Sequence, residues 1–325
     1  MVNFILSGLL PYANAFAQEE LILPAAGQIL PLSPEFNSVI IKGLKINKED
    51  PFKFDFIVNQ GQEKLPEAQF KEESLKLVKY FLASLAIPED DLWVNLSPYE
   101  KNRITTPELG ATGMGKDLLS QDYVLKQLTS SLIYPESEIG KKFWAKVYAL
   151  AEKKYHTTNI PINTFNKVWI VPDKAVVYEN GGVAFVLENH LKVMLEQDYL
   201  SIQKHTGIES EKAQVKDTNQ LGSQIVREIV IPALTKEVNE GKNFSQLRQV
   251  FYSLILATWY KKKIRGGILN KIYSDQNKIG GVNASAKDKD RIYQAYLKAF
   301  KMGVYSYIKE DSDPMNNELI PRKYF

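Results

Sequence analysis

The β-rich stretch between residues 166 and 195 constrains the fold more than any other part of the chain. It reads NKVWIVPDKAVVYENGGVAFVLENHLKVML, and Asn180-Gly181-Gly182 within it is a strong hairpin signal. We interpret the stretch as three β-rich runs, the first two joined through Pro172-Asp173. Because strands joined by a tight turn run antiparallel, it predicts an antiparallel sheet, and no βαβ alternation supports a doubly wound one.

The last of these runs is long enough for its two faces to be assigned. Strict alternation predicts one apolar face, made of Val183, Phe185, Leu187, Leu191, Val193 and Leu195. The other face is more polar and carries Glu188, His190 and Lys192 together with Ala184, Val186 and Met194. His190, between an acid and a base, is a candidate catalytic or metal residue. The alternative is a cross-strand polar ladder on a partly exposed face.

Hairpin and helix patterns are expected on both sides of this stretch. The runs SVIIKGLKI and FKFDFIV predict an N-terminal hairpin over 38–58, with Phe52, Phe54, Phe56 and Val58 on one face. Periodicity and capping signals predict helices over 66–87, from Ser97-Pro98 with Glu100 as a capping box, over 116–134, after Pro135, over 221–241 with a kink at Pro232, over 243–264 as the central buried helix, and over 289–309.

The predicted fold class is therefore α+β, a small, mainly antiparallel sheet packed by helices, with a predominantly helical C-terminal part. Residues 38–204 form the α+β domain in this interpretation. A polar stretch over 204–219 is the best internal boundary. Residues 205–325 form the helical part, either separate from the first domain or packed with it as one unit.

The N-terminus predicts an extracytoplasmic location. Residues 1–17 combine an apolar run, Phe4 to Leu10, with Ala15-Phe16-Ala17, which fits the cleavage pattern of a signal peptide. No Lys or Arg precedes the apolar run, so the alternative is an apolar segment docked on the core. Residues 18–37 carry three prolines and predict an extended linker. The mature chain is then expected to be secreted or periplasmic.

Composition removes several function classes. The chain has 325 residues and no cysteine, which excludes disulfides, thiolate catalysis, iron–sulfur clusters and zinc sites with sulfur ligands. Its net charge of +3 is too small to indicate nucleic acid as a partner. No segment of the mature chain has the apolar length of a membrane span. We expect neither a cofactor nor a bound metal.

The stretch ELGATGMGKDLL, residues 108–119, comes close to a phosphate-binding loop. Gly110, Gly115 and Lys116 have the spacing G-x-x-x-x-G-K, but Asp117 follows where the loop needs Ser or Thr. The preceding residues are polar and include Pro107, so no buried strand leads into it. A helix start, with Asp117 in the first turn, is the better interpretation.

The strongest cluster of chemically useful residues is KEVNEGKNFSQLRQ, residues 236–249. Glu237 and Glu240, like Glu188 and His190 on the sheet, are candidate catalytic residues, and Asn239 and Arg248 are candidate binding residues. The alternative is that the same residues form a turn between two helices. Gly241 would end one helix in the left-handed conformation, Asn243 with Gln246 would cap the next, and Arg248 would pair with Glu237 or Glu240.

Several long runs carry a resemblance to a known group of proteins. DLWVNLSPYEKNRI, NTFNKVWIVPDKAVVYENG, residues 221–264 and the closing PRKYF resemble an uncharacterised family of secreted proteins from uncultured bacteria. The resemblance covers most of the chain after the linker, and it implies no activity, ligand or catalytic residue. Some members continue into further domains, which implies a module of a larger surface or periplasmic protein.

Two functional hypotheses follow. The first is a non-catalytic binding or assembly module of the cell envelope, with envelope proteins or glycans as partners. The alternative is a secreted hydrolase that uses carboxylates, with glycans as one substrate class. A glycoside hydrolase needs two carboxyl groups about 5 to 10 Å apart in one cleft, so the positions of Glu188, Glu237 and Glu240 separate the two hypotheses.

Overall fold

The computed structural model describes residues 23–25, 28–47, 50, 53–86, 112–158, 168–204, 217–265, 307–312 and 319–324. In chain order the elements are β1 (Ile40–Ile46), β2 (Phe54–Asn59), α1 (Glu67–Ala86), α3 (Gly113–Ile133), α4 (Glu138–Tyr155), β3 (Val168–Asn180), β4 (Val183–Leu195), α5 (Glu196–Lys204), α6 (Asp217–Ile225), η4 (Val226–Val230), α7 (Ile231–Glu240), η5 (Lys242–Phe244), α8 (Ser245–Arg265), β5 (Tyr307–Ser312) and β6 (Leu319–Tyr324). Phe52, the capping box at Ser97 and the predicted helix over residues 289–306 lie outside the described residues.

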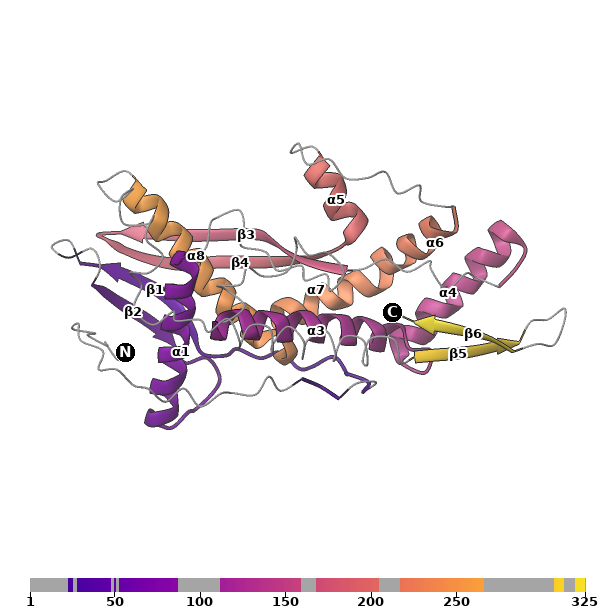
Figure 1. Ribbon diagram of the computed structural model, residues 1–325, viewed down its shortest axis with the longest axis horizontal. Coiled ribbons are helices and arrows are strands. Elements are labelled where there is room, and N and C mark those ends of the chain that lie inside the picture. The colour runs from indigo at the N-terminus through magenta and orange to yellow at the C-terminus, as the bar shows by residue number, and fades with distance from the viewer. Residues whose placement is uncertain are drawn as a thin grey trace.

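An α+β architecture is confirmed. Strands β1 to β4 form one antiparallel sheet in the order β2-β1-β4-β3. Both predicted hairpins, β1–β2 and β3–β4, are present, and the second turns at Gly181 and Gly182 with φ of 60° and 83°. In Figure 1 the β3–β4 hairpin lies along the long axis of the molecule, above α7 and α3.

The central stretch forms two strands where we expected three runs. β3 continues through Pro172 and Asp173, and the register shifts there because Pro172 pairs with Leu191 and Lys174 with His190. Asp173 is thus an extra residue in the ladder, a β-bulge. A proline can stay within an edge strand when its missing N–H faces away from the partner strand. Pro172-Asp173 therefore deforms the strand without ending it.

The predicted faces of β4 are wrong in its first half. Val176 pairs with Glu188 and Val177 with Val186, which leaves Leu187 as an extra residue in a second bulge. Before this bulge the buried residues are Ala184 and Val186, and after it they are Leu191, Val193, Met194 and Leu195. Leu187, predicted on the apolar face, is 56% exposed. One inserted residue reverses the alternation, since side chains in a strand repeat every two residues.

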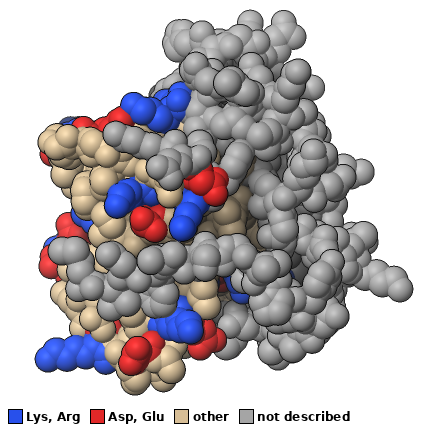
Figure 2. Space-filling model, turned by 90° about the vertical axis from the view of Figure 1, so that its left-hand side faces the viewer, with Lys and Arg blue, Asp and Glu red and all other residues tan. Residues whose placement is uncertain are grey.

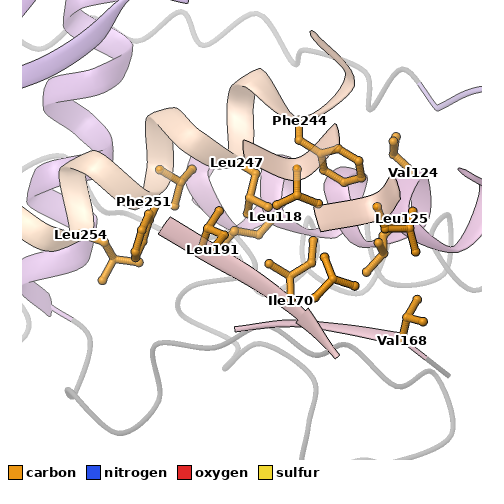
Figure 3. Packing of buried hydrophobic residues seen from close by; sticks show 14 of the residues in the cluster. Leu118, Val124, Leu125, Val168, Ile170, Leu191, Phe244, Leu247, Phe251 and Leu254 are labelled. Atoms are coloured by element: carbon orange, nitrogen blue, oxygen red, sulfur yellow. The ribbon is translucent and has the colours of Figure 1, made fainter. Parts of the chain in front are cut away.

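The helices after residue 217 and the sheet share one hydrophobic core. α8 packs against α1 and β1, and α7 packs against β4. Figure 3 shows Leu118 of α3, Phe244 of η5 and Leu247 of α8 on the side of the core that faces Ile170 of β3 and Leu191 of β4. α8 is the central buried helix that its apolar sequence predicts. Residues 221–260 of the predicted helical part therefore share their core with the predicted α+β domain.

The kink expected at Pro232 takes the form of a π-helical turn. Residues 226–230 form η4 between α6 and α7, and the N–H of Ile231 donates to the carbonyl of Val226, five residues back. Proline cannot donate an intrahelical hydrogen bond, and the wider turn accommodates it without breaking the helix. Arg227 in this turn pairs with Asp198 of α5 at 2.7 Å.

Other elements also differ from expectation. α5, Glu196–Lys204, was not predicted, and its Tyr199 stacks on Trp169 of β3 with ring centroids 4.4 Å apart. The helix predicted over 289–309 is wrong for residues 307–309, because they belong to strand β5 (Tyr307–Ser312), which pairs with β6. An aromatic and β-branched composition is compatible with a strand as well as with a helix, and periodicity alone did not separate them.

Candidate functional site

The turn between α7 and α8 holds the cluster that sequence reasoning selected. α7 ends at Glu240, η5 follows, and α8 begins at Ser245. Gly241 is extended, with φ of −73°, so the predicted left-handed conformation is wrong. The glycine is needed for a close approach, since a Cβ atom there would lie 2.3 Å from the carboxyl carbon of Glu237.

Glu237 is buried and works as an acceptor for three donors. Its side chain is almost inaccessible, with the residue 3% exposed. It accepts hydrogen bonds from the Ser33 N–H at 3.0 and 3.1 Å, from the Ser33 hydroxyl, and from the Asn243 amide at 2.8 Å. Asn243 therefore bonds to Glu237 and to the N-terminal segment instead of capping α8. A carboxylate held in this way is stabilised in place and is not turned toward solvent.

Arg248 is also buried and donates to main-chain carbonyl groups. One guanidinium nitrogen bonds to Val238 at 3.0 Å and to Gly241 at 2.7 Å, and another bonds to Phe36 at 2.7 Å. The expected direct pairing with a Glu237 or Glu240 carboxylate is replaced by these carbonyl contacts. Burial lowers the pKa of Arg248 to about 10, while the negative charge of Glu237 acts in the opposite direction. Arg248 is thus still charged at neutral pH.

The residues held by this cluster belong to the segment predicted as a linker. Residues 28–36, which we call the strap, lie along the surface of α3 and the α7–α8 turn. Every third residue of the strap, Leu30, Ser33 and Phe36, is half-buried, and the others are exposed. A three-residue period is that of a polyproline II helix, and the strap contains Pro31 and Pro34.

Most hydrogen bonds to the strap involve the main-chain groups of the strap. Side chains of α3 contact its first half, where Gln127 donates to the Gln28 carbonyl at 2.7 Å and Ser131 accepts from the Leu30 N–H at 2.9 Å. Contacts of the α7–α8 turn follow, from the Asn243 amide to the Pro31 carbonyl at 3.1 Å and from the Phe36 N–H to the Glu240 carbonyl at 2.8 Å. We call Gln127, Ser131, Glu237, Asn243 and Arg248 the cradle.

Sequence reasoning did not find the α3 part of the cradle. Tyr123, Gln127 and Ser131 lie at i, i+4 and i+8 on α3, and the Tyr123 hydroxyl donates to the Pro24 carbonyl at 3.3 Å. α3 is buried on nearly all sides and also buries other polar side chains, Ser120 and Thr129 among them. The helical spacing of the row was the available signal, and it does not separate this row from the other polar residues of the helix.

Asn239 joins α7 to strand β4. Its amide oxygen accepts from the Leu191 N–H at 2.9 Å, and its amide nitrogen donates to the Leu191 carbonyl at 2.7 Å. Both main-chain groups of Leu191 are thus satisfied by one side chain. Asn239, a candidate binding residue, has a structural explanation.

We expect Asn239→Leu to destabilise the protein by about 2 kcal/mol, because two polar groups of Leu191 lose their partner. Urea unfolding followed by the fluorescence of the buried Trp144 and Trp169 measures the change. Lys236→Ala on the same helix is the control, since the Lys236 side chain is 70% exposed. Equal stability of the two variants would contradict this role of Asn239.

The other two candidate residues lie on the exposed face of the β3–β4 hairpin. Glu188 pairs with Lys174, and their side chains are 61% and 58% exposed. His190 Nδ1 lies 3.0 Å from an Asp173 carboxylate oxygen, again with both side chains nearly half exposed. This arrangement is the cross-strand polar ladder considered as the alternative for His190. On the end of the molecule seen in Figure 2, acidic and basic side chains of the described residues are also interspersed.

Each of the three candidate carboxylates has different partners. Glu188 lies on β4 with a lysine, Glu237 is enclosed by the strap, and the exposed Glu240 side chain lies 3.8 Å from Lys236. The described residues contain no group of three or more His, Asp or Glu placed to hold a metal ion. Within the same ranges no helix has the length and apolar character of a membrane span.

The stretch resembling a phosphate loop is described from Thr112 onward and forms a helix start. Thr112 caps α3 by accepting from the Gly115 N–H at 3.0 Å. Gly113 and Gly115 lie in the first turn of the helix, whereas Asp117, expected in that turn, follows it and accepts a hydrogen bond from the Tyr80 hydroxyl. The carboxylate at this position thus has a partner inside the protein.

We compared the chain with known protein families, curated proteins and solved structures. No family model matches the chain, and searches of curated proteins and of solved structures found no match.

Proposed function

We propose that the protein is a non-catalytic binding or assembly module of the cell envelope. One observation carries the proposal. The cluster around Glu237 and Arg248, whose residue types could serve catalysis, instead binds the main chain of an extended segment. Recognition of an extended peptide through its main-chain groups is a recurring mode of protein–protein contact. A carboxylate that is already occupied by three donors is poorly placed to exchange protons with a substrate.

The exposed residues support a contact function more than a chemical one. Tyr178 and Leu187 are 51% and 56% exposed on the β3–β4 hairpin, which also carries the exposed Lys174–Glu188 pair. An amphipathic surface of this kind suits a protein or glycan partner. Secretion through the signal peptide at residues 1–17 belongs to the same proposal.

A substrate screen tests the non-catalytic role. We expect the whole protein to give no turnover of polysaccharide, peptide or ester substrates above a heat-denatured sample. The variants Glu188→Gln and Glu240→Gln are suitable controls, because both side chains are exposed and their substitution should leave the fold intact. Turnover in the parent protein that either substitution abolishes would overturn the proposal.

The localisation is tested by cell fractionation of a bacterium that expresses the full chain. We expect the mature protein outside the cytoplasm, with Gln18 as its first residue by mass spectrometry, because Ala15-Phe16-Ala17 fits the cleavage pattern. Uncleaved protein that stays in the cytoplasm would contradict this part of the proposal.

A further inference from the structure

We propose that the cradle binds the strap of a second copy of this chain, so that copies assemble by exchanging residues 28–36. The inference rests on the proposed assembly function and names the partner. The partner segment is visible in the structure, since the protein's own strap shows what the cradle fits. A second copy supplies the same segment.

The contacts of the strap do not depend on which copy it belongs to. Apart from the Ser33 hydroxyl, the hydrogen bonds of the cradle go to main-chain groups such as Leu30 N–H, Pro31 carbonyl and Phe36 carbonyl. Exchange therefore re-forms each of these bonds between copies. Pro31 and Pro34 also restrict the strap to extended conformations, which lowers the entropy lost when it docks.

The chain immediately after the strap is fixed independently of the cradle. The Asn37 carbonyl accepts from the Gln62 N–H at 2.8 Å, and the Val39 carbonyl accepts from Gln249 at 2.8 Å. These bonds hold the start of β1 in place whether or not the strap is docked. The junction at Phe36–Asn37 is thus where the strap would pivot toward a second copy.

The outer side of the docked strap carries apolar surface that a second copy could bury. Ile29 and Leu32 are 45% and 41% exposed, and they are two of the large apolar side chains that the described part of the chain leaves at its surface. When two copies exchange straps, the rest of one chain lies next to the rest of the other, with the straps between them. Burial of Ile29 and Leu32 there would favour the exchanged dimer over two closed monomers.

Cross-linking between copies tests the exchange, and the cysteine-free chain makes it specific. Glu35 lies beside Gly241 and Glu240 across the strap–turn contact, and Glu35 and Glu240 are exposed. Glu35→Cys and Glu240→Cys are made in separate chains with tags of different size. The two chains are refolded together and treated with a short bismaleimide. We expect a product that contains one chain of each kind, and a dimer mass in light scattering.

Two controls make either result decisive. The double variant with Glu35→Cys and Glu240→Cys in one chain shows that the linker spans the contact, and Glu67→Cys mixed with Glu240→Cys measures chance linking. Linking only within the double variant, with a monomer mass, would overturn the exchange. The proposed binding function would survive that result, because the substrate screen tests it separately.

Discussion

Replacing Glu237 by alanine is expected to lower the free energy of unfolding by about 3 kcal/mol. The substitution removes the acceptor for the Ser33 N–H, the Ser33 hydroxyl and the Asn243 amide. It also removes the negative charge next to the buried guanidinium of Arg248. Urea unfolding followed by tryptophan fluorescence measures the loss. We expect limited proteolysis to cleave the strap faster in the variant than in the parent protein.

Glu240→Ala is the matched control for this substitution. Glu240 lies in the same turn, but its carboxylate is exposed and its contact with the strap uses the main-chain carbonyl. We expect a change within about 0.5 kcal/mol, as for other exposed positions. Equal losses for the two glutamates, or an unchanged strap in the Glu237 variant, would show that the carboxylate does not anchor the strap.

Phe81→Ala is expected to cost about 4 kcal/mol of stability, the typical loss for a buried aromatic residue. Phe81 of α1 is fully buried, and its ring centroid lies 5.3 Å from Phe54, 5.2 Å from Phe56 and 6.2 Å from Tyr260. These rings join β2, α1 and α8, so the cavity would lie where three elements meet. The midpoint of thermal unfolding should fall by several degrees.

Leu75→Ala on the same helix separates the effect of the core from that of helix propensity. Leu75 is 39% exposed, so we expect a loss below about 1 kcal/mol. A loss as large as that of Phe81→Ala would mean that the aromatic cluster is not the main contact between the sheet and the helices.

Local patterns predicted most elements of the fold. Glycines at 181 and 182 indicated the hairpin, and helical spacing of apolar residues predicted α1, α3 and α4, because these signals act over a few neighbouring residues. The two bulges of β3–β4 were missed for a physical reason. Whether Leu187 is inserted in the ladder depends on the pairing partner, and one strand's alternation does not contain that information.

The candidate site was located by sequence, but its role was not. The sequence selected Glu237, Asn239 and Arg248 at one turn, and the structure brings these three together near that turn. The partners of Glu237 and Arg248 include Ser33 and Phe36, which are about two hundred residues away in the chain. Their composition predicted a proline-rich linker. Local sequence patterns do not predict which distant part of the chain such a segment contacts.

The separation between the strap and its partners has a consequence for how the chain folds. The Ser33–Glu237 contact closes a loop of 204 residues, and the Phe36–Arg248 contact closes one of 212. Closing loops of this length is entropically costly until the elements between them have formed, so docking of the strap should be a late event. A ribosome must synthesise the chain past Arg248 before the strap can dock in its cradle. Until then the strap stays accessible to chaperones.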